Sequence, residues 1–229
     1  MIHEPPLLRI KRRFDRPAKA LRDRLAAANS CWIGDALEGR AGMNVSIKSL
    51  GTGPVPFCGP AITCVTGVNA NVALSAAISM AEAGDVIVVA NEAFDGAAVI
   101  GDVLAGMAKN RGVAGIVIDG VARDLVGLKE IGLPIFARGV TLNSCVRMGI
   151  GTVGLPVQAG GQRVCSGDFI YADDDGVAVI PQELLERTAD RIDEIAAAEK
   201  GIVQRVRDGL DRPDFLDDLL NSDRVEYVD

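Results

Sequence analysis

In this chain of 229 residues, DVIVVA at residues 85–90 is followed by VIGDVLAGMAKN at 99–110 and VAGIVI at 113–118. The two short apolar runs are typical of buried strands, and the longer segment between them has the spacing of a helix. Strands that alternate with helices in this way favour an α/β core in which some strands pair in parallel.

The sequence on either side of this unit adds further elements. Upstream, apolar spacing predicts helices at 17–29 and 71–83 and strands at 45–50 and 61–68, with a loop at 91–98. Downstream, it predicts a helix at 123–131, strands at 134–136, 152–157, 162–165, 168–172 and 176–180, and a long charged helix at 182–206. No repeat or long linker marks a boundary, so we expect one domain over residues 1–229.

The composition excludes several classes of function. The net charge is −7 and aromatic residues make up only 4% of the chain. Such a protein lacks both the phosphate-neutralising surface and the stacking side chains that nucleic-acid binding requires. The apolar runs are far shorter than the ~20 residues of a membrane-spanning helix. We therefore expect neither a nucleic-acid nor a membrane partner.

Histidine and cysteine usage narrows the chemistry further. The only histidine is His3, which excludes a three-histidine zinc site and disfavours a Ser-His-Asp arrangement. The five cysteines form no CxxC pair, and their odd number is typical of reduced, mostly buried thiols in a cytoplasmic protein. They are Cys31, Cys58, Cys64, Cys145 and Cys165.

Two glycine-containing segments resemble ligand-binding motifs. GIGTVG at 149–154 matches GxGxxG, but no helical pattern follows it, so we interpret it as a turn beside a strand. DDDG at 173–176 resembles the start of a calcium loop, but the position of the final glutamate ligand is Gln182. A tight turn between two strands is the better interpretation.

The residues best suited to binding or catalysis lie at two turns that follow strands. Gly101 and Asp102 fall near the first turn of a predicted helix, where free amides and the helix dipole favour an anion. The turn at 119–124 contains Arg123 and Asp124 and opens at the carboxyl end of the next strand, where crevices form in α/β proteins.

Together these turns could hold a 2-oxo acid. An arginine binds a carboxylate or enolate oxygen through charge-assisted bonds, and an aspartate is a hard ligand suited to Mg²⁺ or Mn²⁺. The alternative is that Asp102 caps a helix while Arg123 and Asp124 form a solvated turn, and spacing alone favours this alternative.

The same segments resemble a known family. The spacing from Asp102 to Arg123-Asp124 is similar to the motif of the class II pyruvate aldolases of the RraA-like superfamily, which include 4-hydroxy-4-methyl-2-oxoglutarate / 4-carboxy-4-hydroxy-2-oxoadipate aldolases. GVAGIVIDG at 112–120 and GDFIYADDDGVAVIP at 167–181 add to the resemblance, which covers about residues 20–205.

The resemblance implies a fold, an assembly and an activity. The fold is a compact β/β/α swivelling type with a long C-terminal helix, assembled as a homotrimer or homohexamer with active sites between subunits. The activity is retro-aldol cleavage of a pyruvyl-containing 4-hydroxy-2-oxo acid, decarboxylation of oxaloacetate, or both. The two reactions share a metal-bound pyruvate enolate.

The resemblance also implies a role for each site residue. Asp124 holds the divalent cation, partly through water, and Arg123 contacts the keto or enolate oxygen. The backbone amides of Gly101, Asp102, Val103 and Leu104 bind the pyruvyl carboxylate, and the Asp102 side chain orders water on the metal.

Glu199 matches an acidic residue that reaches in from a neighbouring subunit. The alternative is a solvated glutamate beside Lys200.

A second function remains open. The ribonuclease regulators of the superfamily share the fold and the arginine but lack the acid that follows it. A non-catalytic protein that binds a ribonuclease or another partner is therefore the alternative, and the presence of Asp124 disfavours it.

Overall fold

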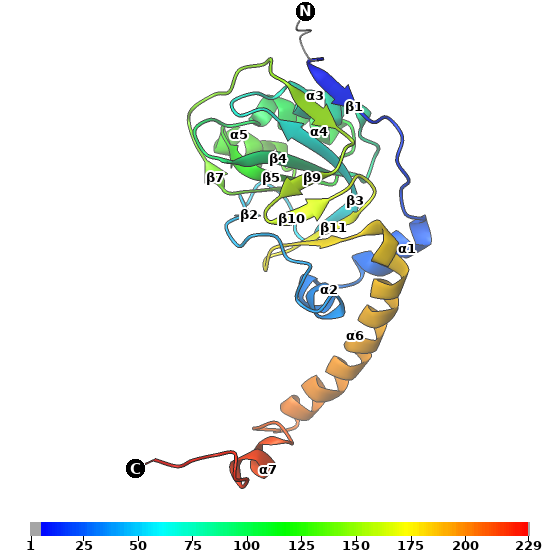
Figure 1. Cartoon of the computed structure of the whole chain (residues 1–229), viewed down its shortest axis with the longest axis vertical. Helices are drawn as coiled ribbons and strands as arrows, with labels where there is room; N and C mark the ends of the chain where they lie inside the picture. The colour runs from blue at the N-terminus through cyan, green and yellow to red at the C-terminus, as the bar shows by residue number, and fades with distance from the viewer. Residues whose placement is uncertain (1–5, 229) are drawn as a thin grey trace, which may run out of the picture. The chain divides into compact units, whose positions relative to one another are not determined.

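Parallel strands form the centre of the sheet in the computed structural model, which describes residues 6–228 (Figure 1). The strands β3, β4, β5 and β6 lie side by side in this order and all run in the same direction. Their bounds are Phe57–Thr66, Val86–Phe94, Gly115–Ala122 and Ile135–Ala137. The α/β class and the parallel pairing predicted from the sequence are confirmed.

Shorter strands extend this sheet at both edges and from β3. β8 (Gly151–Val153) pairs antiparallel with β3 and carries β1 (Leu8–Ile10) on its other side. β2 (Lys48–Ser49) pairs with β6, and β7 (Gly139–Val140) pairs with the end of β5. β11 (Phe169–Ala172) and β12 (Val177–Ile180) form a hairpin on β3, and β9 (Val157–Ala159) and β10 (Gln162–Val164) form a separate one.

Helices α3, α4 and α5 connect the parallel strands, and the other helices lie toward the two ends of the chain. Their bounds are α1 Lys19–Ala26, α2 Ser30–Ala36, α3 Val72–Met80, α4 Asp102–Asn110, α5 Leu125–Ile131, the 3₁₀ helix η1 Gln182–Leu184, α6 Leu185–Arg207 and α7 Leu216–Leu220. The long charged helix predicted near the C-terminus is thus confirmed as α6. Among residues 6–228, every helix is either too short or too polar to traverse a bilayer.

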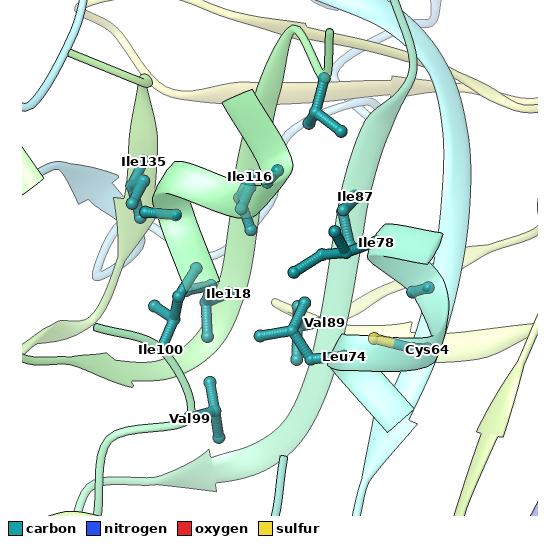
Figure 2. Packing of buried hydrophobic residues seen from close by; sticks show 14 of the residues in the cluster. Cys64, Leu74, Ile78, Ile87, Val89, Val99, Ile100, Ile116, Ile118 and Ile135 are labelled. Carbon is teal, nitrogen blue, oxygen red and sulfur yellow. The ribbon is translucent and has the colours of Figure 1, made fainter. Parts of the chain in front are cut away.

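Both faces of the central sheet are buried, and the alternation of side chains along β4 shows how. Ile87 and Val89 point to the face covered by α3, α4 and α5 (Figure 2). Val86, Val88 and Ala90 point to the opposite face, against β9, β10 and β11. Each fully buried Val or Ile contributes about 1.5–3 kcal/mol to folding, which explains why this run is apolar without interruption.

Several predicted boundaries differ from the structure because tertiary packing decides them. The helix predicted from Val99 begins at Asp102, since Ile100 forms a parallel bridge with Ala122 and both Val99 and Ile100 are buried in the core. The predicted turn at 119–124 is strand up to Ala122. The predicted loop at 91–98 begins inside β4, where a bulge changes the register between Ala90 and Phe94.

Of the turns predicted at the two motif-like segments, the one at DDDG is confirmed, whereas residues 151–153 of GIGTVG form strand β8. GIGTVG ends in β8 and leads into no helix, and DDDG connects the antiparallel strands β11 and β12. All five cysteines are free thiols, but only Cys64 is fully buried and Cys31 is exposed, so the prediction of mostly buried thiols is wrong. Burial raises the pKa of Cys58 to about 11 and that of Cys64 to about 12. His3 lies outside the described residues.

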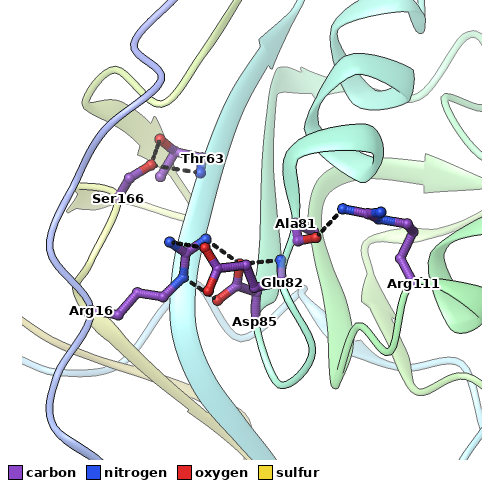
Figure 3. A network of polar contacts seen from close by, with 7 residues as sticks. All are labelled: Arg16, Thr63, Ala81, Glu82, Asp85, Arg111 and Ser166. Carbon is purple, nitrogen blue, oxygen red and sulfur yellow. Dashed lines mark hydrogen bonds and ion pairs between the residues drawn. The ribbon is translucent and has the colours of Figure 1, made fainter.

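An ion-pair network ties the segment before α1 to the central sheet (Figure 3). Arg16 donates two hydrogen bonds to Asp85, at 2.9 and 2.7 Å, and forms an ion pair with Glu82. Asp85 is 1% exposed and also accepts a bond from the Glu82 amide. Because the buried carboxylate keeps a full set of partners, its desolvation is offset.

The chain divides into two compact units, one ending at Ile192 and the other beginning at Asp193. The first contains the whole sheet and α1 to α5. The second contains the last part of α6 and α7, and its side chains are mostly exposed. The expectation of one domain over residues 1–229 stays a prediction.

Candidate active site

A cleft of about 580 Å³ lies where three parallel strands end. Its walls come from the N-terminus of α3, which follows β3, from the N-terminus of α4, which follows β4, and from the residues directly after β5. The carboxyl ends of parallel strands meet at one edge of a sheet, and this edge is where α/β proteins bind ligands. The cleft holds every predicted site residue of the first unit: Gly101, Asp102, Val103, Leu104, Arg123 and Asp124.

The first turn of α4 forms one wall. Gly101 is its N-cap in an extended conformation and has no side chain that could cap the amides. Asp102 begins the helix, and its Oδ1 accepts a hydrogen bond of 2.7 Å from the Val103 amide. One amide of the predicted carboxylate cradle is therefore already bonded, so a ligand that uses it has to displace Asp102.

Arg123 and Asp124 line the cleft directly beside this turn. The Arg123 amide donates to the carbonyl of Ile100 at 3.0 Å, which fixes the end of β5 beside the entry to α4. The Arg123 Nε lies 3.2 Å from Asp124 Oδ2, and the two side chains are 38% and 40% exposed. Both charged groups are thus open to a ligand that enters the cleft.

Asp124 has an unusual backbone. Its φ of 60° and ψ of 43° place it in the left-handed region, where few residues other than glycine, asparagine and aspartate are found. Left-handed residues of this kind cluster at functional sites, since the surrounding structure must hold them in place. The conformation turns the chain sharply from β5 into α5 and leaves the carboxylate at the cleft.

Two glycines allow the carboxylates to approach the backbone closely. A Cβ atom on Gly101 would overlap Asp124 Oδ2, and one on Gly127 would lie 2.6 Å from Asp102 Oδ2. Both contacts are shorter than real Cβ atoms allow. The positions of the two cleft aspartates therefore depend on glycine at 101 and 127.

The donor set suits a small hard cation. Among residues 6–228, no three His, Cys, Asp or Glu side chains come together in a metal-binding group. Mg²⁺ needs no such cage, because it keeps several waters and binds through one or two carboxylates plus oxygens of the substrate. Asp124 supplies one exposed carboxylate, and Asp102 supplies a second from the same cleft. The residues present therefore fit such an ion.

A loop that the sequence reasoning missed forms the outer wall. Ser144, Cys145, Arg147 and Met148 line the cleft. Parallel bridges from Ala98 to Ser144 and from Ala70 to Val146 hold the loop over the strand ends. The segment has no periodic pattern, and nothing in the sequence signals these long-range bridges. Arg147 adds a second guanidinium to the cleft.

Cys145 is a neutral thiol in this cleft. Burial raises its pKa, and the nearby Arg123 guanidinium opposes the shift only in part. Because the thiolate is the nucleophilic form, the geometry does not favour Cys145 as a nucleophile.

Glu199 lies on α6 within the second unit and is exposed. Its side chain interacts with other groups of the chain. Its assignment to the catalytic residues stays a prediction.

The close approach of Gly101 and Asp124 gives a first testable result. We expect Gly101→Ala to displace the Asp124 carboxylate and lower kcat/KM on the order of 10²-fold, as misplaced catalytic groups do. Gly106→Ala is the matched control, since its Cβ meets only the end of the Ile131 side chain at 3.4 Å in the same helix. Steady-state kinetics and thermal unfolding of both variants check this. Equal activities of the two variants would contradict the role of Gly101.

Known proteins resemble this chain in sequence and fold. A family model described as RraA-like, Aldolase/RraA, matches residues 30–179. A Halalkalibacterium halodurans protein named "Putative 4-hydroxy-4-methyl-2-oxoglutarate aldolase" is 39% identical over 150 residues, which are 66% of this chain and 71% of that protein.

Solved structures share the fold. An uncharacterized protein from Pseudomonas syringae has a TM-score of 0.76 at 27% identity, covering 86% of this chain and 92% of that one. Streptomyces coelicolor RraAS2, described as an unusual member of the RNase ES inhibitor RraA protein family, has a TM-score of 0.72 at 29% identity, covering 83% and 100%. The RraA-like fold predicted from the sequence is confirmed.

Proposed function

This chain belongs to the RraA-like family, described as Aldolase/RraA, and from that premise we propose that it is a divalent-metal-dependent lyase. Its substrate is a pyruvyl-containing 4-hydroxy-2-oxo acid, which it cleaves between C3 and C4, and it also decarboxylates oxaloacetate. The observation that carries the proposal is the meeting of Asp124, Arg123 and the first turn of α4 in one cleft.

The first turn of α4 binds and orients the substrate. Its amides and the positive end of the helix dipole attract the carboxylate at C1. This places the 2-oxo group toward Arg123, whose side chain lies beside Gly101 in the same cleft. Asp102, hydrogen-bonded to the same turn, orders water beside the reacting carbons.

Arg123 stabilises the charge that develops during cleavage. As the C3–C4 bond breaks, its electron pair moves into the enolate of pyruvate and negative charge grows on the C2 oxygen. The other fragment leaves as a carbonyl compound in the aldol reaction and as CO₂ in the decarboxylation. A donor already in place stabilises this charge without reorganisation. In the aldol reaction the C4 hydroxyl gives its proton to the water that Asp102 orders, and in both reactions this water protonates C3 to give pyruvate.

Asp124, with Asp102 nearby, is the residue that would hold Mg²⁺ or Mn²⁺. When bound, such an ion polarises the 2-oxo group as a Lewis acid. A Schiff-base mechanism has less support, because no lysine lines the cleft in the described part of the chain. Lys48, which lies on β2, donates to the Asp175 carbonyl instead.

We expect pyruvate to form from oxaloacetate with added Mg²⁺ or Mn²⁺ and no enzymatic rate above background in excess EDTA. A coupled assay for pyruvate measures this, with the spontaneous metal-catalysed decarboxylation subtracted from a protein-free control. Turnover that EDTA leaves intact, or a lysine trapped by borohydride, would show that the mechanism is wrong. Direct assay of 4-hydroxy-4-methyl-2-oxoglutarate tests the aldol cleavage.

We further propose that the active protein is a homotrimer or homohexamer in which Glu199 of one subunit serves the cleft of another. Large apolar side chains that are more than half exposed surround the cleft, as expected of a surface covered by another subunit. They are Val103, Met107 and Met148, which line it.

The second candidate function is a non-catalytic regulator that binds a ribonuclease. The observation in its favour is the structural similarity to RraAS2. Activity distinguishes the two, because a regulator should show no metal-dependent turnover of either acid and should be indifferent to the loss of Asp124.

A further inference from the structure

We propose that a second hollow, between α2 and the start of α6, binds an organic anion with an apolar body. The hollow has a volume of about 440 Å³ and shares no lining residue with the cleft. It lies entirely within the first unit, and its volume is in the range of small-molecule sites. The inference therefore goes beyond the proposed lyase function and does not depend on it.

The walls of the hollow are apolar. Ala36 and Leu37 at the end of α2 face it, together with Val179 at the end of β12 and Leu184 in η1. Ala36 and Leu37 also pack on the buried cluster that joins α2 to the first turns of α6. These walls would contact a hydrocarbon chain or ring, and burial of that surface favours binding by about 25 cal/mol for each Å².

Cations surround this apolar surface. Arg40, Arg163 and Arg187 line the hollow, against a single acidic residue, Glu38. Arg40 lies 2.6 Å from Glu38 and is neutralised by it. Arg163 and Arg187 form no ion pair or side-chain hydrogen bond with residues 6–228 and are exposed.

The arginines concentrate positive charge on an otherwise acidic protein. The chain carries a net charge of −7, so two guanidiniums that form no ion pair beside one hollow attract anions to that place rather than to the surface at large, although Arg163 also attracts the Asp168 carboxylate. Guanidinium groups bind carboxylates through paired, charge-assisted bonds. A carboxylate with a hydrocarbon body therefore fits both the rim and the walls.

Octanoate is the probe for this site, and isothermal titration calorimetry measures its binding. We expect saturable binding of octanoate at one site per chain. Octanamide, which lacks the charge, and acetate, which lacks the hydrocarbon body, should each bind at least about tenfold more weakly than octanoate. The double variant Arg163→Gln/Arg187→Gln should bind octanoate at least about tenfold more weakly, since it loses the charge-assisted bonds to the carboxylate.

A double variant with the same change of charge, Arg12→Gln/Arg13→Gln, is the control and should bind octanoate as the unmodified protein does. Equal affinity of the Arg163/Arg187 variant and the control would overturn the proposal. It would also be overturned if Arg123→Ala abolished octanoate binding, because the ligand would then occupy the active-site cleft.

Discussion

Arg123→Ala is expected to lower kcat for oxaloacetate decarboxylation by roughly 10²–10³, the usual loss when one preorganised donor to a developing oxyanion is removed. The reason is the position of the Arg123 side chain, which lines the cleft beside the first turn of α4 and is 38% exposed. Because Arg123 donates to substrate and not to the cation, the dissociation constant for Mn²⁺ should change little. Initial rates and calorimetric metal titrations measure both quantities.

The conservative replacement makes this test sharper. Arg123→Lys keeps the charge but loses the planar fork that can donate two bonds, so we expect it to recover little of the rate. A variant at 123 with near-normal kcat would mean that another group, such as Arg147, stabilises the enolate. Arg147→Gln, measured in parallel, identifies that case.

Asp124→Asn is expected to weaken Mg²⁺ and Mn²⁺ binding by at least tenfold, and high metal concentration should restore part of the activity. Asparagine is the replacement of choice because it tolerates the left-handed backbone found at this position. The variant therefore removes the charge while it keeps the turn from β5 into α5. Metal titrations and rates over a wide range of metal concentrations check this.

Glu130→Gln is the matched control for Asp124. Glu130 is an exposed acid on the same helix and does not line the cleft. Its loss should leave both metal binding and turnover unchanged. Equal loss of metal affinity in the Arg123 and Asp124 variants would show that the division of roles between them is wrong.

The sequence was sufficient to predict the central unit because its signals are local. The apolar run at 86–90 is buried on both faces of the sheet, and no other element type would suit it. Arg123 and Asp124 were found for the same reason, since they directly follow a recognisable strand. Val99 and Ile100 were assigned to a helix because apolar spacing alone does not distinguish extended core residues from the start of an adjacent helix.

The remainder of the cleft depends on distant contacts. The loop that carries Cys145 and Arg147 reaches the strand ends through backbone bonds, from the Val146 amide to Asn69 and from the Ala98 amide to Asn143. Backbone bonds of this kind place no demand on the side chains and leave no trace in the sequence. The second hollow, which we propose binds an organic anion, likewise combines residues of α2, β10 and α6, which are far apart along the chain.

The left-handed conformation of Asp124 has a consequence for how the protein evolves. Glycine and asparagine both adopt this conformation readily, so either could replace the aspartate without straining the turn from β5 into α5. A single change at this position could thus remove the cleft's exposed carboxylate while leaving the fold intact.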